Sequence, residues 1–101
     1  MVNIALKLLR LMKRKILIIT TKNCLGCSIA INNTQTVIAK SSKDIAFEIK
    51  DFTELPKRLI HKYKAYDYPT TVFLEDDEVT FKFVGSTHVN CIQRYIDLYL
   101  K

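Results

Sequence analysis

The sequence predicts an α/β domain in which a mixed four-stranded sheet is flanked by helices. Two strand-like runs early in the chain are separated by a segment with helical periodicity, a pattern typical of parallel strands joined by a crossover helix. Two further strand-like runs lie close together and predict an antiparallel hairpin, and an amphipathic segment closes the chain. With 101 residues, the chain can build one hydrophobic core but not two.

The first strand is predicted over residues 16–20, a continuous apolar and β-branched stretch that is typical of a strand buried on both faces. Residues 45–50 alternate in polarity and predict the second strand. Right-handed crossovers make these two strands parallel neighbours and place the hairpin on the other side. Between them, apolar positions recur at the spacing of one helical face: Cys27, Ala30, Ile31, Thr34, Val37 and Ile38. Poor helix formers interrupt this segment, so tertiary packing must hold the helix.

The second half of the chain continues the same order of elements. Thr53 is predicted to cap a helix whose first turn contains Pro56 and whose inward face consists of Leu55, Leu59 and Tyr63. Residues 70–74 and 79–84 predict the hairpin strands, and the acidic residues between them suit a solvated turn better than a metal site. Gly85 ends the last strand, and Ser86 or Thr87 is predicted to cap the closing helix, whose inward face is marked by Val89, Ile92, Ile96 and Tyr99.

A basic amphipathic extension, residues 1–14, is predicted to precede a domain formed by residues 15–101. Ile4, Leu8 and Leu11 share one helical face, and basic side chains occupy another. Charges recur every third residue, so the segment lacks the apolar region of a signal peptide, and it is too short to cross a bilayer. We expect residues 1–12 to dock against the domain rather than contact a membrane.

The charge of the chain is unevenly distributed. The net charge is +6, and no acidic residue precedes Asp44. The chain shows neither the aromatic and basic interleaving of an RNA-binding sheet nor zinc-finger spacing, so no nucleic-acid partner is expected. The basic half is interpreted as a solvated surface, with steering of an acidic protein partner as the functional alternative.

Cys24 and Cys27, three residues apart, lie where the first strand passes into the first predicted helix. A thiol at a helix N-terminus lies among unpaired backbone N–H groups that favour its thiolate, so the spacing indicates redox chemistry. The alternatives are a zinc half-site and two buried core thiols. Structural zinc needs four ligands, the only other candidates are Cys91, His61 and His88, and the two histidines have no tight spacing to each other. Three cysteines are an odd number, which argues against a secreted disulfide framework and for a reducing, cytoplasmic location.

The order of elements, the Cys-x-x-Cys pair and Tyr68-Pro69-Thr70 at the start of the third strand together resemble the thioredoxin superfamily over about residues 15–100. The resemblance implies a thioredoxin-like fold with a cis Pro69 against the cysteine pair, and cis peptides are accessible mainly before proline. It also implies that the backbone of Tyr68 pairs with an extended substrate segment and that Gly85 lies near the groove.

Two positions depart from the typical thioredoxin pattern. The dipeptide between the cysteines is Leu25-Gly26, and Ile18 stands where typical thioredoxins bury an aspartate. The redox potential is therefore not assigned. The short front end and the variable dipeptide are similar to small glutaredoxin-like proteins, whereas the hairpin is more similar to thioredoxin, so the resemblance is to the superfamily and not to one branch.

The leading hypothesis is a small thiol-disulfide oxidoreductase that acts on protein disulfides. Cys24 attacks, Cys27 resolves the mixed disulfide, Leu25 and Gly26 shape access, and Lys22 supports the Cys24 thiolate. The chain lacks a dinucleotide fingerprint, so no cofactor is expected, and the reductant is either a thioredoxin reductase or glutathione. The alternatives are a non-catalytic binding module or scaffold with this fold, and a copper or zinc carrier. Two further expectations are that Cys91 is a half-buried packing thiol and that Tyr66 joins Tyr68 in an apolar rim.

Overall fold

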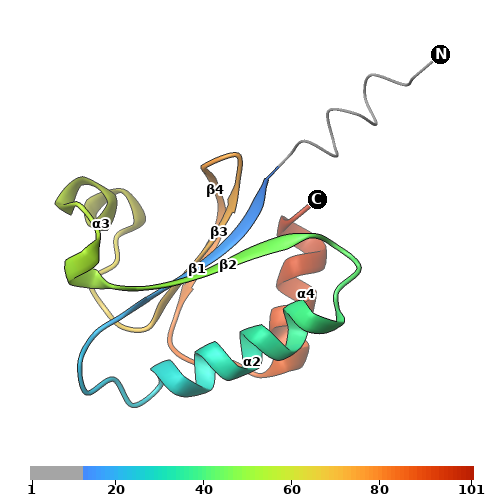
Figure 1. Cartoon of the computed structure of the whole chain (residues 1–101), viewed down its shortest axis with the longest axis horizontal. Coiled ribbons are helices and arrows are strands. Elements are labelled where there is room, and N and C mark those ends of the chain that lie inside the picture. The colour runs from blue at the N-terminus through green and yellow to red at the C-terminus, as the bar shows by residue number, and fades with distance from the viewer. Residues whose placement is uncertain (1–12) are drawn as a thin grey trace.

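A four-stranded mixed sheet in the order β2-β1-β3-β4 forms the centre of the protein (Figure 1). The computed structural model describes residues 13–101, so the predicted N-terminal helix falls outside the described residues. β1 is parallel to β2 and antiparallel to β3, and β3 and β4 form an antiparallel hairpin. The predicted fold class and strand arrangement are confirmed.

Each predicted strand and helix of the domain is present, with small changes at the ends. The elements are β1 (Arg14–Thr20), α2 (Cys27–Lys40), β2 (Ile45–Asp51), the 3₁₀ helix η1 (Phe52–Glu54), α3 (Lys57–Tyr63), β3 (Thr70–Glu75), β4 (Glu78–Val84) and α4 (Val89–Tyr99). β1 begins two residues earlier than predicted because Arg14 and Lys15 extend the pairing with both neighbouring strands.

The larger part of the core lies between the sheet and the helices α2 and α4, which cover the same face of the sheet (Figure 1). The buried positions of α2 are Cys27, Ala30, Thr34 and Val37, which belong to the predicted face. They share this layer with strand and α4 residues, among them Ile16, Ile18, Phe73, Ile92 and Ile96. Burial of one such aliphatic side chain contributes about 1.5–3 kcal/mol, which explains how a segment of poor intrinsic propensity remains helical.

The opposite face of the sheet is covered by α3. Tyr63 and Ala65 pack there against apolar residues of β1 and β3, namely Leu17, Ile19, Val72 and Leu74. The Lys82 amine on β4 donates hydrogen bonds to the carbonyl oxygens of Tyr63 and Lys64 at 2.8 and 3.2 Å. These bonds satisfy carbonyl groups at the C-terminal end of α3 and tie this short helix to the hairpin.

The predicted helix caps are wrong in both places. α3 begins only at Lys57, with Pro56 at its N-cap and no side-chain cap, and Thr53 lies inside η1. η1 is capped by Asp51, whose carboxylate accepts a hydrogen bond from the Thr53 backbone N–H while its own N–H donates to Glu54. α4 is capped by His88, whose Nδ1 accepts from the Asn90 N–H at 3.2 Å. The ring nitrogen of His88 therefore accepts the hydrogen bond that was expected to go to a Ser86 or Thr87 hydroxyl, because any acceptor at that position satisfies a free N–H group of the helix.

The acidic segment between β3 and β4 forms a tight turn, as predicted. Asp76 and Asp77 both have positive φ, at 50° and 67°, the conformation of a type I′ hairpin turn. Asp76 also exchanges hydrogen bonds with the backbone of Lys13. Among the described residues, no helix is long and apolar enough to cross a membrane.

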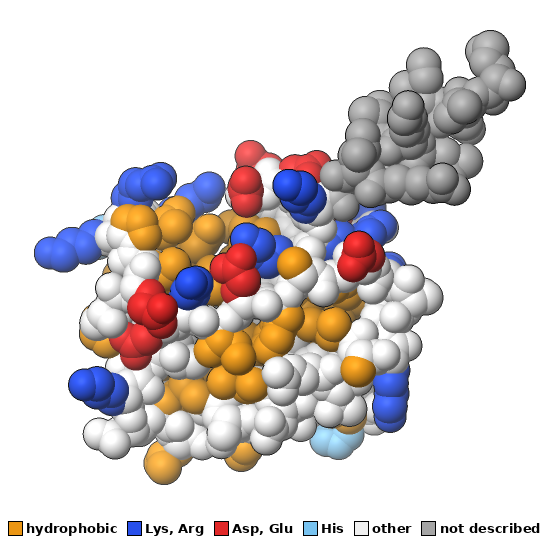
Figure 2. Space-filling model, viewed as in Figure 1, with side chains coloured by type: hydrophobic (Ala, Val, Ile, Leu, Met, Phe, Trp, Pro, Cys, Tyr) orange, Lys and Arg blue, Asp and Glu red, His pale blue; other side chains and the backbone are white. Residues whose placement is uncertain are grey.

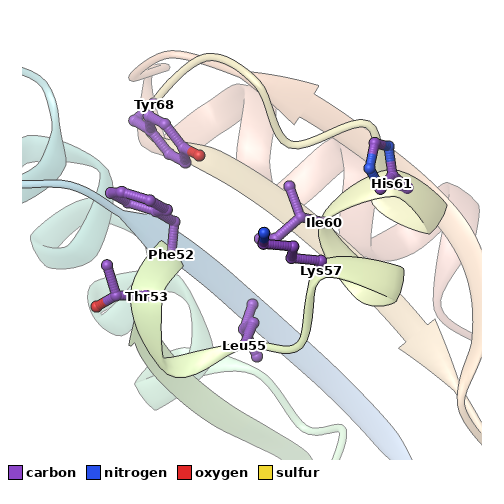
Figure 3. Close-up of a pocket in the computed structure, with 7 residues that line it drawn as sticks. All are labelled: Phe52, Thr53, Leu55, Lys57, Ile60, His61 and Tyr68. Carbon is purple, nitrogen blue, oxygen red and sulfur yellow. The ribbon is translucent and has the colours of Figure 1, made fainter.

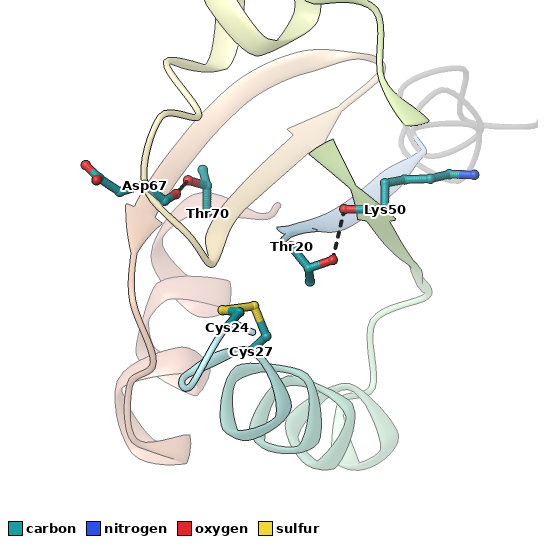
Figure 4. Close-up of a disulfide and its surroundings, with 6 residues drawn as sticks. All are labelled: Thr20, Cys24, Cys27, Lys50, Asp67 and Thr70. Atoms are coloured by element: carbon teal, nitrogen blue, oxygen red, sulfur yellow. Dashed lines mark hydrogen bonds between the residues drawn. A yellow bond between two sulfur atoms is a disulfide. The ribbon is translucent and has the colours of Figure 1, made fainter. Parts of the chain in front are cut away.

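Two adjacent buried threonines of β3 differ in how their hydroxyl groups are satisfied. The Thr70 hydroxyl donates to the Asp67 carbonyl (Figure 4), whereas the Thr71 hydroxyl has no partner among the described residues. Thr71 stands opposite Ile18 in the sheet and is 1% exposed. Its hydroxyl therefore lies on the face covered by α2, where an unsatisfied polar group costs free energy.

We expect Thr71→Val to increase the free energy of unfolding by about 1 kcal/mol, because valine replaces an unsatisfied hydroxyl by a methyl group. Urea denaturation measures this change. The matched control is Thr70→Val, which removes a hydroxyl that is used and should lower the free energy of unfolding by about 1 kcal/mol. Equal destabilisation by both substitutions would mean that the Thr71 hydroxyl has a partner in solution.

Candidate functional site

Cys24 and Cys27 form a disulfide at the head of α2, where the chain leaves β1 (Figure 4). Their Cα atoms are 5.4 Å apart, within the range for bridged cysteines. Cys24 is half-buried, whereas Cys27 is 7% exposed. The first cysteine is therefore the one that an incoming partner can reach.

The loop between β1 and α2 has a conformation that presents the first cysteine. Asn23 has a φ of 57°, a left-handed conformation that asparagine tolerates better than most residues. Gly26 precedes the first residue of α2, and its carbonyl accepts the Ala30 N–H at 3.0 Å. The first turn of α2 has neither a side-chain cap nor an acidic residue. Free N–H groups at this end of the helix favour a thiolate over a neutral thiol.

Two segments far away in the sequence approach this loop. The Tyr68–Pro69 peptide is cis, as the sequence predicted. The Gly85 N–H donates a hydrogen bond to the Pro69 carbonyl at 2.8 Å, which joins the segment before β3 to the segment after β4. A Cβ atom built on Gly26 would lie 3.5 Å from Cδ of Pro69 and 3.8 Å from Ser86. The structure thus brings Gly26, Pro69 and Gly85 together, and it adds Ser86, which the sequence suggested only as a helix cap.

The side chain of Tyr68 is fixed by contacts, while its backbone N–H and carbonyl groups make no hydrogen bond among the described residues. Its ring lies against Phe52, with the ring centroids 5.5 Å apart, and its hydroxyl donates to the Ala65 carbonyl at 2.9 Å. Burial raises the pKa of this hydroxyl. Within residues 13–101, the N–H and carbonyl groups of Tyr68 make no backbone hydrogen bond. An extended segment of another protein can therefore pair with them.

No protein-family model and no curated protein sequence matches this chain. Solved structures do match. A mutant thioredoxin from Halobacterium salinarum superposes with a TM-score of 0.74 at 20% identity, covering 88% of this chain and 76% of that one. This chain has the thioredoxin fold. The germline-specific thioredoxin Deadhead of Drosophila melanogaster has a TM-score of 0.72 at 19% identity, covering 87% of this chain and 82% of its own. Thioredoxin-2, a component of the malaria parasite protein secretion machinery, has a TM-score of 0.72 at 16% identity, covering 86% and 84%.

On this thioredoxin fold, Leu25 and Lys22 lie on the outside of the cysteine loop. Leu25 is 95% exposed, and Lys22 is also exposed. The hydroxyl and backbone N–H of Thr53 hold the pKa of the Asp51 carboxyl below its usual value, and the positive charge of Lys22 acts in the same direction.

Ile18, which stands where typical thioredoxins bury an aspartate, lies in the apolar core. Ile18 is 0% exposed and packs in the same core cluster as Ala30 and Val37 of α2.

The two histidines have other partners. His61 Nδ1 lies 2.7 Å from the Tyr66 hydroxyl oxygen, and His88 caps α4. Among residues 13–101, no group of three or more His, Cys, Asp or Glu side chains is arranged to hold a metal ion.

The expectation that Cys91 is a half-buried packing thiol is wrong, because Cys91 is exposed. α4 turns Ile92 and Ile96 into the core, and the residue before Ile92 is rotated by about 100° away from that face. Tyr66 is 57% exposed and bonds to His61 rather than packing in the core.

We expect Gly85→Ala to lower the free energy of unfolding by about 1–2 kcal/mol, because Gly85 has a φ of +91°, which an alanine adopts only with strain. Gly26→Ala is the control. Gly26 has a φ of −92°, and an added Cβ would make ordinary contacts, so the change should stay below about 0.5 kcal/mol. Urea denaturation of both variants tests the comparison, and equal losses would contradict it.

Proposed function

We propose that this protein is a small thiol-disulfide oxidoreductase that exchanges the Cys24/Cys27 dithiol with disulfides of protein substrates. The observation that carries the proposal is the disulfide between a half-buried Cys24 and a buried Cys27 at the head of α2, beside the Tyr68–Pro69 segment. The thioredoxins that share the fold are consistent with this chemistry.

In the first step, the Cys24 thiolate attacks one sulfur atom of the substrate disulfide. The substrate S–S bond breaks, a mixed disulfide forms, and the released substrate thiolate takes up a proton from solvent. The free N–H groups at the start of α2 stabilise the Cys24 thiolate before attack. The greater exposure of Cys24 supports its assignment as the attacking residue.

In the second step, Cys27 loses its proton and its thiolate attacks Cys24 of the mixed disulfide. The intermolecular S–S bond breaks, the Cys24–Cys27 disulfide forms, and the second substrate sulfur leaves as a thiol after protonation. The substrate gains two electrons and two protons, and the protein is left oxidised. The residue six positions before Cys24 is Ile18, which has no carboxylate to accept a proton, so we assign the acceptor of the Cys27 proton to solvent.

The neighbouring residues are proposed to hold the substrate. The Tyr68 backbone pairs with an extended segment that contains the reacting cysteine, next to Pro69. Gly85 keeps the Pro69 segment in place through its hydrogen bond, and Gly26 leaves room beside Pro69. Leu25 offers an apolar contact, as its full exposure permits.

The oxidised pair must be returned to the dithiol by a reductant that supplies two electrons. The candidates are a thioredoxin reductase and glutathione, two molecules of which become glutathione disulfide per cycle. A reducing, cytoplasmic compartment suits either candidate and agrees with the odd number of cysteines. The protein itself is proposed to need no cofactor.

We expect Cys24→Ser to abolish the reduction of insulin disulfides, with a loss of at least about a hundredfold, because serine does not form the mixed disulfide. Cys27→Ser should still react once and accumulate the mixed disulfide with insulin, which mass spectrometry detects. Cys91→Ser is the control and should keep full activity, since Cys91 lies outside the pair. Equal turnover by wild type and Cys24→Ser would remove the catalytic role and leave a binding module or scaffold.

Reduction of the purified, oxidised protein separates the two candidate reductants. A thioredoxin-type protein is expected to be reduced by NADPH with thioredoxin reductase within minutes, and a glutaredoxin-type protein by millimolar glutathione. The measurement is the disappearance of the Cys24–Cys27 disulfide by thiol alkylation and mass spectrometry. Slow reduction by both systems would contradict a general reductase function.

A further inference from the structure

A pocket of about 470 Å³ opens beside the Tyr68 ring (Figure 3). One wall comes from η1 and the residues that follow it, another from α3, and the third is Tyr68 itself. The lining residues are Phe52, Thr53, Leu55, Lys57, Ile60, His61 and Tyr68. The volume is large enough for one large apolar side chain and part of its neighbour.

The lining combines apolar walls with a basic edge. Four of the seven side chains are apolar or aromatic, Lys57 and His61 are basic, and none is acidic. In Figure 2, hydrophobic side chains at the α3 corner of the molecule lie beside Lys and Arg side chains. The negative charges of Asp51 and Asp67 act on Tyr68, so the basic edge is the part of the lining that Lys57 and His61 form. An occupant with an apolar body and an adjacent negative charge is therefore complementary to the pocket.

The pocket is held open by contacts that do not depend on an occupant. The Tyr68 hydroxyl is bonded to Ala65, and Phe52 lies against the Tyr68 ring on the other side. Phe52 nevertheless remains 39% exposed, a large fraction for a phenylalanine in a packed domain. The capping box formed by Asp51 and Glu54 holds η1 and thereby the position of Phe52.

Tyr68 belongs to both the pocket and the thiol site. Its ring forms a wall of the pocket, while its free backbone groups lie directly before Pro69, which contacts the cysteine loop at Gly26. A substrate strand that pairs with this backbone directs alternate side chains to opposite sides, at a rise of about 3.3 Å per residue. One side chain within about three residues of the reacting cysteine is thus directed toward the pocket.

We propose that this pocket selects protein substrates by an apolar side chain that lies close to the reacting cysteine and is followed by an acidic residue. The apolar side chain enters between Phe52, Ile60 and Tyr68, and the carboxylate lies against the Lys57 amine. This inference rests on the proposed function, because the substrate segment reaches the pocket only when it is paired with Tyr68.

The test uses the Cys91→Ser protein, so that the exposed Cys91 thiol does not release colour, and synthetic nonapeptides with a central cysteine, each joined by a disulfide to 5-thio-2-nitrobenzoate. Attack of reduced Cys24 on the peptide sulfur forms the protein–peptide disulfide and releases the coloured thiolate, so the second-order rate constant is read directly. A Leu-Glu pair is placed in turn at each of the pairs of neighbouring positions that lie within about three residues of the cysteine and leave the cysteine itself unchanged, in an alanine background. At one of these positions, we expect a rate constant about tenfold above the all-alanine peptide, the order of discrimination that hydrophobic pockets achieve.

Two matched pairs of variants assign the preference to the pocket. In Lys57→Glu, the rate constant for the Leu-Glu peptide should fall about threefold, and the rate constant for a Leu-Lys peptide should rise. Arg58→Glu makes the same charge change on the same helix outside the lining, and neither rate constant should change. Phe52→Ala should lose the preference for leucine over alanine, and Leu98→Ala, a 59% exposed residue on α4, should keep it. The charge effect should fade at high salt, since it acts at the surface.

The outcomes separate this inference from the proposed function. A much faster reaction of the all-alanine peptide with the Cys91→Ser protein than with the Cys24→Ser/Cys91→Ser protein supports the oxidoreductase, whatever the pocket does. If no peptide in the series exceeds the all-alanine peptide by threefold, or if each variant behaves as its control does, the pocket does not select substrates. A preference that survives in Phe52→Ala would likewise overturn the proposal.

Discussion

The burial of β1 in the middle of the sheet is the constraint on which the candidate site depends. Its residues Ile16 to Ile19 are all nearly inaccessible, because β2 and β3 flank the strand and helices cover both faces. Burial on both faces fixes the position and the direction of the strand. The cysteine loop follows directly after its last residue and therefore lies at the edge of the sheet where α2 begins. The hydrogen bond from Gly85 to Pro69 then ties the ends of β3 and β4 to the same edge. Moving β1 would separate the cysteines from every other part of the site.

The two cysteines differ in their exposure to solvent, as thiol exchange through a first attacking thiol requires. Cys24 and Leu25 face the outside, Cys27 is covered by the start of α2, and the Tyr68 backbone offers unpaired groups beside them. The pocket beyond Tyr68 extends this surface toward α3 with apolar walls and a basic edge. In the proposed function, the disulfide and the pocket would contact the same substrate segment through Tyr68. Selectivity would then come from contacts outside the cysteine pair, because the exchange chemistry itself does not distinguish one substrate disulfide from another.

Much of the fold could be predicted because its signals are local. The apolar run of β1, the alternation of β2 and the two strands around an acidic turn each follow from periodicity, and chirality orders the strands. The caps were less predictable, since α3 begins after Pro56 without a side-chain cap and His88 caps α4 in place of Ser86 or Thr87. Several residues near a helix start carry acceptors, and only the local backbone decides which one reaches the free N–H groups.

The sequence by itself determined the chemistry that is available: two cysteines three residues apart at a strand-to-helix junction, a proline before a strand and a glycine after one. These are properties of neighbouring residues, and spacing along the chain reports them directly. The tertiary structure alone decided that Cys91 faces solvent and that Phe52, Lys57 and Tyr68 enclose a pocket. Such contacts join segments far apart in the sequence, and they arise only when burial of the two core layers sets the distances between elements.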